Sequence, residues 1–109
     1  MSVYYPDRWV VLEVTDPTTS ITNKKIFAGW YGGYLGSDEW RLSSGIEKVV
    51  EHEDHYEVHN VSGSVYKCSK QGVGCTGYMS QIYDTWMSEL EKNGQDLSSI
   101  KIMENLEVD

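Results

Sequence analysis

The sequence predicts an α+β domain, in which a twisted antiparallel meander of about five strands carries one amphipathic helix on one face. Short β-branched and aromatic runs alternate with turn residues between residues 9 and 70. A single apolar stripe at helical spacing follows, from Met79 to Leu90. A chain of 109 residues suits one domain and is too short for two. We therefore assign residues 1–109 to a single domain.

The predicted strands lie in the first two-thirds of the chain. Polar and glycine-containing segments separate them, with a loop at Thr15–Asn23, a hairpin turn at Glu53–Asp54 and a tight turn at Ser62–Gly63. The β-branched run WVVLEV is typical of a strand. The strands are expected at Trp9–Val14, Lys24–Tyr31, Glu39–Ser44, the two arms of a hairpin over Ile46–Val61, and Ser64–Lys70.

The helix is predicted over Tyr78–Asn93. Its apolar positions recur every three or four residues and form one continuous stripe, made of Met79, Ile82, Tyr83, Trp86, Met87 and Leu90. Thr76 or Ser80 is expected to cap its start, and the pair Asn93-Gly94 supplies the left-handed residue that ends it. A helix with such a stripe must cover a sheet. In the C-terminal tail, residues 97–109, we expect an edge strand around Ile100–Met103, with a short helix as the alternative.

The charge and composition exclude several classes of function. The formal net charge is −8, and the nine Lys and Arg are scattered along the chain. No basic run is present to neutralise several phosphates, so binding to nucleic acid or to an anionic membrane is disfavoured, and a basic protein partner fits better. The chain has no apolar run of membrane-spanning length and no signal-peptide core, which predicts a cytoplasmic protein. Cys68 and Cys75 are then expected as free thiols.

Rings and glycines are concentrated between Phe27 and Leu42. Trp30, Tyr34 and Trp40, together with Arg41, form a candidate stacking platform for a base, a sugar or a peptide. Strand alternation places Phe27 and Tyr31 on one face and Trp30 on the other, so one set of rings is expected in the core and the other is available for contacts. Self-association is a further alternative, in which an edge strand at either Trp9–Val14 or Ile100–Met103 pairs with the same strand of a second copy.

Gly72, Gly74 and Gly77 spell the spacing G-x-G-x-x-G directly before the predicted helix. In a dinucleotide-binding fold such glycines bring backbone N–H groups to a pyrophosphate. Here the preceding strands are predicted to be antiparallel, and little chain is left after the helix for a βαβ sheet. A flexible connection is therefore favoured, with exposed amides that hold a phosphate or another anion as the alternative. No cofactor is predicted.

Two further clusters are candidates for chemistry. With a turn at Glu53–Asp54, His52 lies opposite His55, and His59 follows on the same face, which is a weak candidate for a metal site. A solvated hairpin explains these polar residues more simply. Cys68 alternates with Tyr66 in a strand and is expected in the core, whereas Cys75, near the helix start, is expected to be stabilised as a thiolate. No catalytic signature surrounds either cysteine, so no catalytic residue is assigned.

The phrases DRWVVLEV, KIFAGWYGGYLGSDEWRLSSGI and SGSVYKC, followed by one amphipathic helix, resemble small uncharacterised proteins of tailed phages. The resemblance covers roughly residues 7–92. It implies an accessory protein in the host cytoplasm that binds a host protein, and it assigns no site residues. The function expected is a non-catalytic binding module. The alternatives are a small-molecule binder that sequesters a nucleotide-like signal and, third, a small metal-dependent enzyme.

Overall fold

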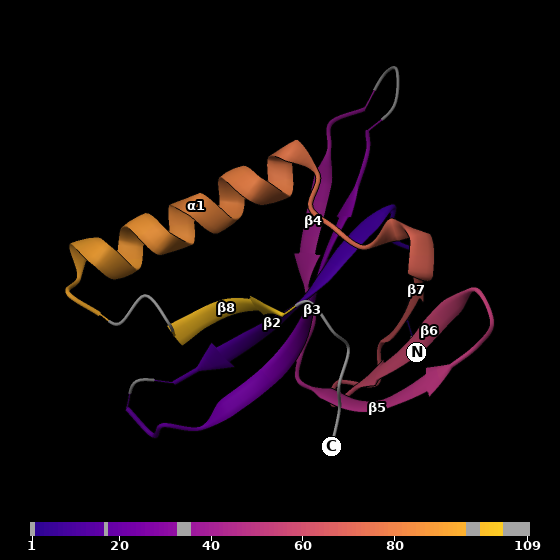
Figure 1. Ribbon diagram of the computed structural model, residues 1–109, viewed down its shortest axis with the longest axis horizontal. Coiled ribbons are helices and arrows are strands. Elements are labelled where there is room, and N and C mark those ends of the chain that lie inside the picture. Colours follow the sequence, from indigo (N-terminus) through magenta and orange to yellow (C-terminus); the bar gives the residue numbers. More distant parts are fainter. Residues whose placement is uncertain (1, 17, 33–35, 96–98, 104–109) are drawn as a thin grey trace.

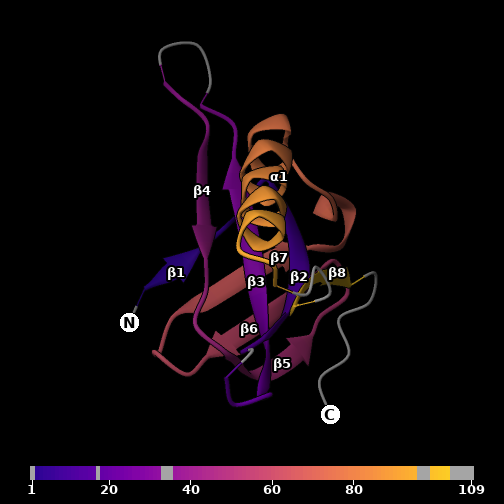
Figure 2. The same ribbon diagram turned by 90° about the vertical axis from the view of Figure 1, so that its left-hand side faces the viewer.

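The computed structural model describes residues 2–16, 18–32, 36–95 and 99–103, and it arranges them in three layers. Helix α1 covers one face of a first sheet, and a second sheet packs on the opposite face (Figures 1 and 2). The strands are β1 (Val3–Tyr4), β2 (Arg8–Thr15), β3 (Thr22–Trp30), β4 (Glu39–Leu42), β5 (Ile46–Glu51), β6 (His55–Asn60), β7 (Val65–Ser69) and β8 (Ile100–Met103), and the helices are η1 (Lys70–Gly72) and α1 (Gly77–Lys92).

The α+β class is confirmed, but the single five-stranded meander is wrong. Two four-stranded sheets are present, with strand orders β4-β3-β2-β8 and β1-β7-β6-β5. The predicted turns do separate strands, yet β2, β3 and β4 belong to the first sheet and β5, β6 and β7 to the second. The short strand β1 pairs in parallel with β7 and was not predicted. Turn residues mark where strands end, whereas the choice of partner depends on packing between distant segments.

Strand β2 contributes side chains to both hydrophobic cores, one between the two sheets and one between the first sheet and α1. Trp9 and Val11 point to the second sheet, while Val10 and Leu12 point to the helix, as alternation along a strand requires. A strand buried on both faces reads as the continuous apolar run observed here. β2 lies between β3 and β8, so the prediction that it forms an exposed edge is wrong. β8 does form an edge, which confirms the strand predicted at Ile100–Met103.

Helix α1 begins and ends within one residue of the prediction. The Thr76 hydroxyl accepts a hydrogen bond of 3.0 Å from the backbone N–H of Met79 and caps the first turn. Gly94, with φ of +69°, ends it. Its stripe packs on Val10, Leu12 and Phe27 of the first sheet. Within the described residues, no helix combines the length and apolar character needed to cross a membrane.

Candidate functional site

A groove rich in aromatic side chains lies beside β1 and β4, each of which is the outermost strand of its sheet. It has a volume of about 770 Å³. We call it the aromatic groove and define it by Val3, Tyr4, Tyr5, Trp30, Asp38, Glu39, Trp40, Arg41 and Tyr78. The fold thus brings together three of the four residues predicted as a stacking platform, Trp30, Trp40 and Arg41. The fourth, Tyr34, lies outside the described residues.

Trp40 is anchored on one side and open on the other. It pairs with Gly29 across β3 and β4, on the face that the helix covers. Its ring packs edge-on against Phe27, at 5.9 Å between centroids, and against Trp86, at 5.5 Å. The residue is nevertheless 36% exposed. A large ring that is already held in place loses little conformational entropy when a partner covers it.

Trp30 lies on the opposite face of the first sheet. Its indole N–H donates a hydrogen bond of 3.0 Å to the carbonyl oxygen of Tyr5, and its ring lies 6.2 Å from that of Tyr4. The predicted split between Phe27 and Trp30 is therefore confirmed. Tyr31 follows the end of β3 and is exposed, so it does not share the buried face of Phe27.

The aromatic groove is lined by charged side chains of both signs. The guanidinium of Arg41 lies 4.7 Å from the centroid of the Tyr4 ring, a cation–π contact. None of the ion pairs among the described residues includes Arg41. Asp38 accepts a hydrogen bond of 2.9 Å from the backbone N–H of Gly32, and Glu39 is exposed beside it. A ligand would meet two carboxylates and one guanidinium.

The outer edge of β4 adds backbone groups to this surface that pair with no other described strand. The N–H of Ser43 bonds to the carbonyl oxygen of Ile26 on β3, at 2.9 Å. Because backbone groups alternate in direction along a strand, those of Trp40 and Leu42 point away from β3. β3 is the only strand that pairs with β4 among the described residues. Such an edge is a template for one more strand.

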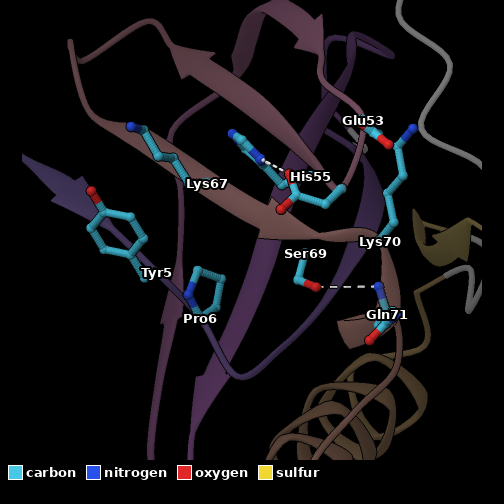
Figure 3. Close-up of a pocket in the computed structure, with 9 residues that line it drawn as sticks. Tyr5, Pro6, Glu53, His55, Lys67, Ser69, Lys70 and Gln71 are labelled. Atoms are coloured by element: carbon cyan, nitrogen blue, oxygen red, sulfur yellow. Dashed lines mark hydrogen bonds and ion pairs between the residues drawn. The ribbon is translucent and has the colours of Figure 1, made fainter.

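A second hollow, the polar pocket, shares Tyr5 with the aromatic groove (Figure 3). It has a volume of about 780 Å³ and is lined by Tyr5, Pro6, Glu53, Asp54, His55, Lys67, Ser69, Lys70 and Gln71. Most of its charges are already paired. The Lys70 ammonium is 2.7 Å from Glu51, and Nδ1 of His55 is 2.7 Å from Asp54. The polar pocket therefore offers a ligand less unpaired charge than its residue types suggest.

The ring nitrogens of the three histidines lie 2.6–3.4 Å from carboxylate oxygens on the β5–β6 hairpin. His52 and His55 stack with 4.5 Å between ring centroids, which confirms that they lie opposite each other. Glu57 lies between His52, at 3.4 Å, and His59, at 2.6 Å. In the described part of the chain, no three His, Cys, Asp or Glu side chains are placed to hold one metal ion. The described residues therefore provide no set of ligands for the metal site that was considered at this histidine cluster.

The carboxylates of this hairpin are expected to make the protein less stable in acid. The hydrogen bond from His59 lowers the pKa of Glu57, and that from His55 lowers the pKa of Asp54. A carboxylate with a lowered pKa in the folded state stabilises the fold above its unfolded pKa of about 4, and this contribution is lost as the pH falls further. We expect the urea midpoint to drop between pH 6 and pH 3, and to drop less in Glu57→Gln. An equal drop in both proteins would contradict the prediction, and Glu47→Gln on β5 is the control.

The glycines of the G-x-G-x-x-G segment, which were considered as an anion site, serve mainly to build the fold. Gly72 is buried, and a side chain there would meet the carbonyl oxygen of Asp7 at 2.9 Å. Gly74 has φ of +139°, and its N–H donates to the carbonyl oxygen of Trp9 at 2.9 Å. Gly77 is the first residue of α1. The amide of Gly74 is thus already bonded, and an anion site here stays a prediction.

Neither cysteine is an activated nucleophile. Both are free thiols, as predicted. Cys68 is fully buried in the core between the sheets, and burial raises its pKa to about 12. Burial also raises the pKa of Cys75, so the expectation of a stabilised thiolate near the helix start is wrong. Removal from water opposes the charged form here more than the nearby helix terminus favours it.

Sequence reasoning missed the tyrosines that complete the aromatic groove, Tyr4, Tyr5 and Tyr78. The ring pair YYP near the N-terminus was the available signal, because adjacent rings before a proline are typical of an extended, contact-making segment.

Scans of protein-family models, curated proteins and solved structures each found no match.

Proposed function

We propose that this protein is a non-catalytic binding module that uses the aromatic groove to hold another protein. The observation that carries the proposal is the placement of Trp40, which is fixed by Phe27 and Trp86 and still 36% exposed, beside the unpaired edge of β4. Tryptophan and tyrosine dominate the binding energy of protein interfaces. An open strand edge supplies main-chain hydrogen bonds to an extended segment of the partner.

The charge supports a partner with a basic binding segment. The net charge of −8 attracts cations over the whole surface, and Asp38 and Glu39 place two carboxylates in the groove. A lysine or arginine near these carboxylates would also lie near the faces of the groove's rings. The resemblance to tailed-phage proteins supports a protein of the bacterial host as this partner.

Capture of proteins from a bacterial lysate tests the proposal. The immobilised wild-type chain is expected to retain a partner that Trp40→Ala binds at least thirty-fold more weakly, since a central aromatic residue contributes about 2 kcal/mol or more. Tyr31→Ala, which removes an exposed ring outside the groove, is the matched control and should retain the partner. Thermal melting of each variant separates lost contacts from lost folding.

A second substitution at the same position tests the role of the strand edge. Trp40→Pro removes the ring and also the outward-pointing N–H, whereas Trp40→Ala removes the ring only. If a partner strand adds to β4, the proline variant binds more weakly than the alanine variant. The proposal fails if no partner is retained above background, or if a retained partner binds both variants as tightly as the wild type.

The second candidate, a binder of nucleotide-like molecules, is favoured by one observation. Arg41 and Tyr4 line the aromatic groove and also a smaller polar hollow beside it. A ligand with a flat ring and an anionic group could therefore contact both surfaces. The two carboxylates of the groove oppose this reading, so we rank it below the protein partner.

A further inference from the structure

A small polar hollow beside the aromatic groove has an unusual set of lining residues for so acidic a chain. We call it the serine hollow. Its volume is about 310 Å³. Its lining residues are Ser2, Tyr4, Arg41, Leu42, Ser43, Ser44, Ser62, Gly63, Ser64 and Tyr66. Although the sequence holds seventeen Asp and Glu, none of the described carboxylates lines this hollow, and Arg41 is its one charged group.

The hydroxyl groups of the serine hollow form a chain with one proton left over. The Ser44 hydroxyl donates to that of Ser62 at 2.9 Å, and it accepts from the N–H of Ser62 at 3.1 Å. The hydroxyls of Ser62 and Ser64 are 3.2 Å apart, and one of them donates to the other. Asn60 donates to the Ser64 hydroxyl at 3.2 Å. The Asn60 Oδ1 atom is buried and lacks a partner among the described residues, so the Asn60 amide and the Ser62–Ser64 pair together leave one acceptor and one hydroxyl proton unused.

Tyr66 supplies a second unused donor. Tyr66 lines the hollow, and none of the hydrogen bonds described includes its hydroxyl, although the residue as a whole is only 1% exposed. Burial raises its pKa to about 12, so the hydroxyl keeps its proton at neutral pH. The hydroxyl therefore remains a donor, and an oxygen of a ligand in the hollow can accept its hydrogen bond.

Arg41 supplies the charge. Its guanidinium is held against the ring of Tyr4, and it makes no ion pair with a described carboxylate. A planar guanidinium held in this way is suited to bind two oxygens of one phosphate. Hydroxyl donors without competing carboxylates complete a site for an oxyanion.

We propose that the serine hollow binds the phosphate group of a small ligand through Arg41, Tyr66 and the Ser62–Ser64 pair. The ligand is either inorganic phosphate or a nucleoside monophosphate. In the second case the base extends toward the aromatic groove, which shares Tyr4 and Arg41 with the hollow. This site does not depend on the protein partner proposed above, because the hollow does not include Trp40.

Titration with sodium phosphate and with adenosine monophosphate, followed by amide NMR shifts at constant ionic strength, tests the proposal. We expect saturable shifts at Ser62, Ser64 and Tyr66 below about 10 mM ligand. Arg41→Gln should weaken binding at least tenfold, since a hydrogen bond to a charged group is worth more than a neutral one, and Tyr66→Phe about threefold to tenfold. Trp40→Ala should leave inorganic phosphate binding unchanged.

Matched variants separate this site from general electrostatics. Arg8→Gln removes the same charge at a residue that does not line the hollow, and Tyr31→Phe removes an exposed hydroxyl. Tighter binding of adenosine monophosphate than of phosphate, with a change in tryptophan fluorescence, identifies the nucleotide as the ligand, and equal binding identifies phosphate. The proposal is overturned if neither probe shifts these amides, or if Arg8→Gln weakens binding as much as Arg41→Gln.

Discussion

Replacing Phe27 with alanine is expected to lower the free energy of unfolding by about 3–5 kcal/mol. Phe27 has no exposed surface and joins three elements. Its ring lies 5.0 Å from that of Trp86 on α1 and 5.9 Å from that of Trp40 on β4. Removing it takes apolar area from the core and leaves a cavity that rigid neighbours do not fill. Since a domain is stable by only about 5–15 kcal/mol, this loss is a large share of the total.

Urea unfolding followed by far-UV circular dichroism measures this effect without relying on the tryptophans near the cavity. Phe27→Leu keeps most of the volume and should lose less stability than Phe27→Ala. Tyr31→Ala, at an exposed site, should change the free energy of unfolding by no more than about 0.5 kcal/mol. If Phe27→Ala were as mild as Tyr31→Ala, α1 would not be packed on the first sheet as described.

The second large effect is expected where Gly29 passes under the helix. A side-chain carbon built on Gly29 falls 2.3 Å from the sulfur of Met79, which is fully buried. Gly29→Ala should therefore destabilise the fold by about 1–3 kcal/mol through overpacking, and Met79→Ala by about 2–5 kcal/mol through a cavity. In the double variant the new methyl group enters the space that Met79 vacates. Its loss should be smaller than the sum of the single losses by at least about 0.5 kcal/mol.

A double-mutant cycle from urea midpoints and slopes provides this measurement. Gly77→Ala is the control, because nothing lies within 4 Å of the added carbon. It should leave the stability unchanged or raise it by about 0.4–1 kcal/mol, since alanine restricts the unfolded chain. Additive losses in the cycle would show that Met79 does not hold the helix against Gly29.

These two sites also connect stability with the proposed function. Phe27 and Gly29 hold the surfaces on which Trp40 and Trp86 rest. A variant that loosens this packing changes the orientation of Trp40 even if the chain still folds. We therefore expect conservative core variants such as Phe27→Leu to weaken capture of the partner while leaving phosphate binding in the serine hollow intact.

Local patterns were enough to locate most secondary structure. The spacing of Met79, Ile82 and Trp86 predicts α1 because helical periodicity is a property of neighbouring residues. The hairpin turn at Glu53–Asp54 and the ending at Gly94 are likewise local. By contrast, nothing near Val3–Tyr4 indicates pairing with β7, since that pairing joins segments about sixty residues apart and depends on the rest of the core.

The sequence by itself determined the class of the fold, the helix, most of the strands and the acidic charge, and it named Trp30, Trp40 and Arg41 as candidates. Only the tertiary structure decided that the strands form two sheets and that β2 is central. It also placed Tyr4 beside Arg41 and set Arg41 in one hollow with the Ser62–Ser64 pair. The physical reason is that propensity and periodicity act between near neighbours, whereas a binding surface is made by residues that meet only after distant strands have packed.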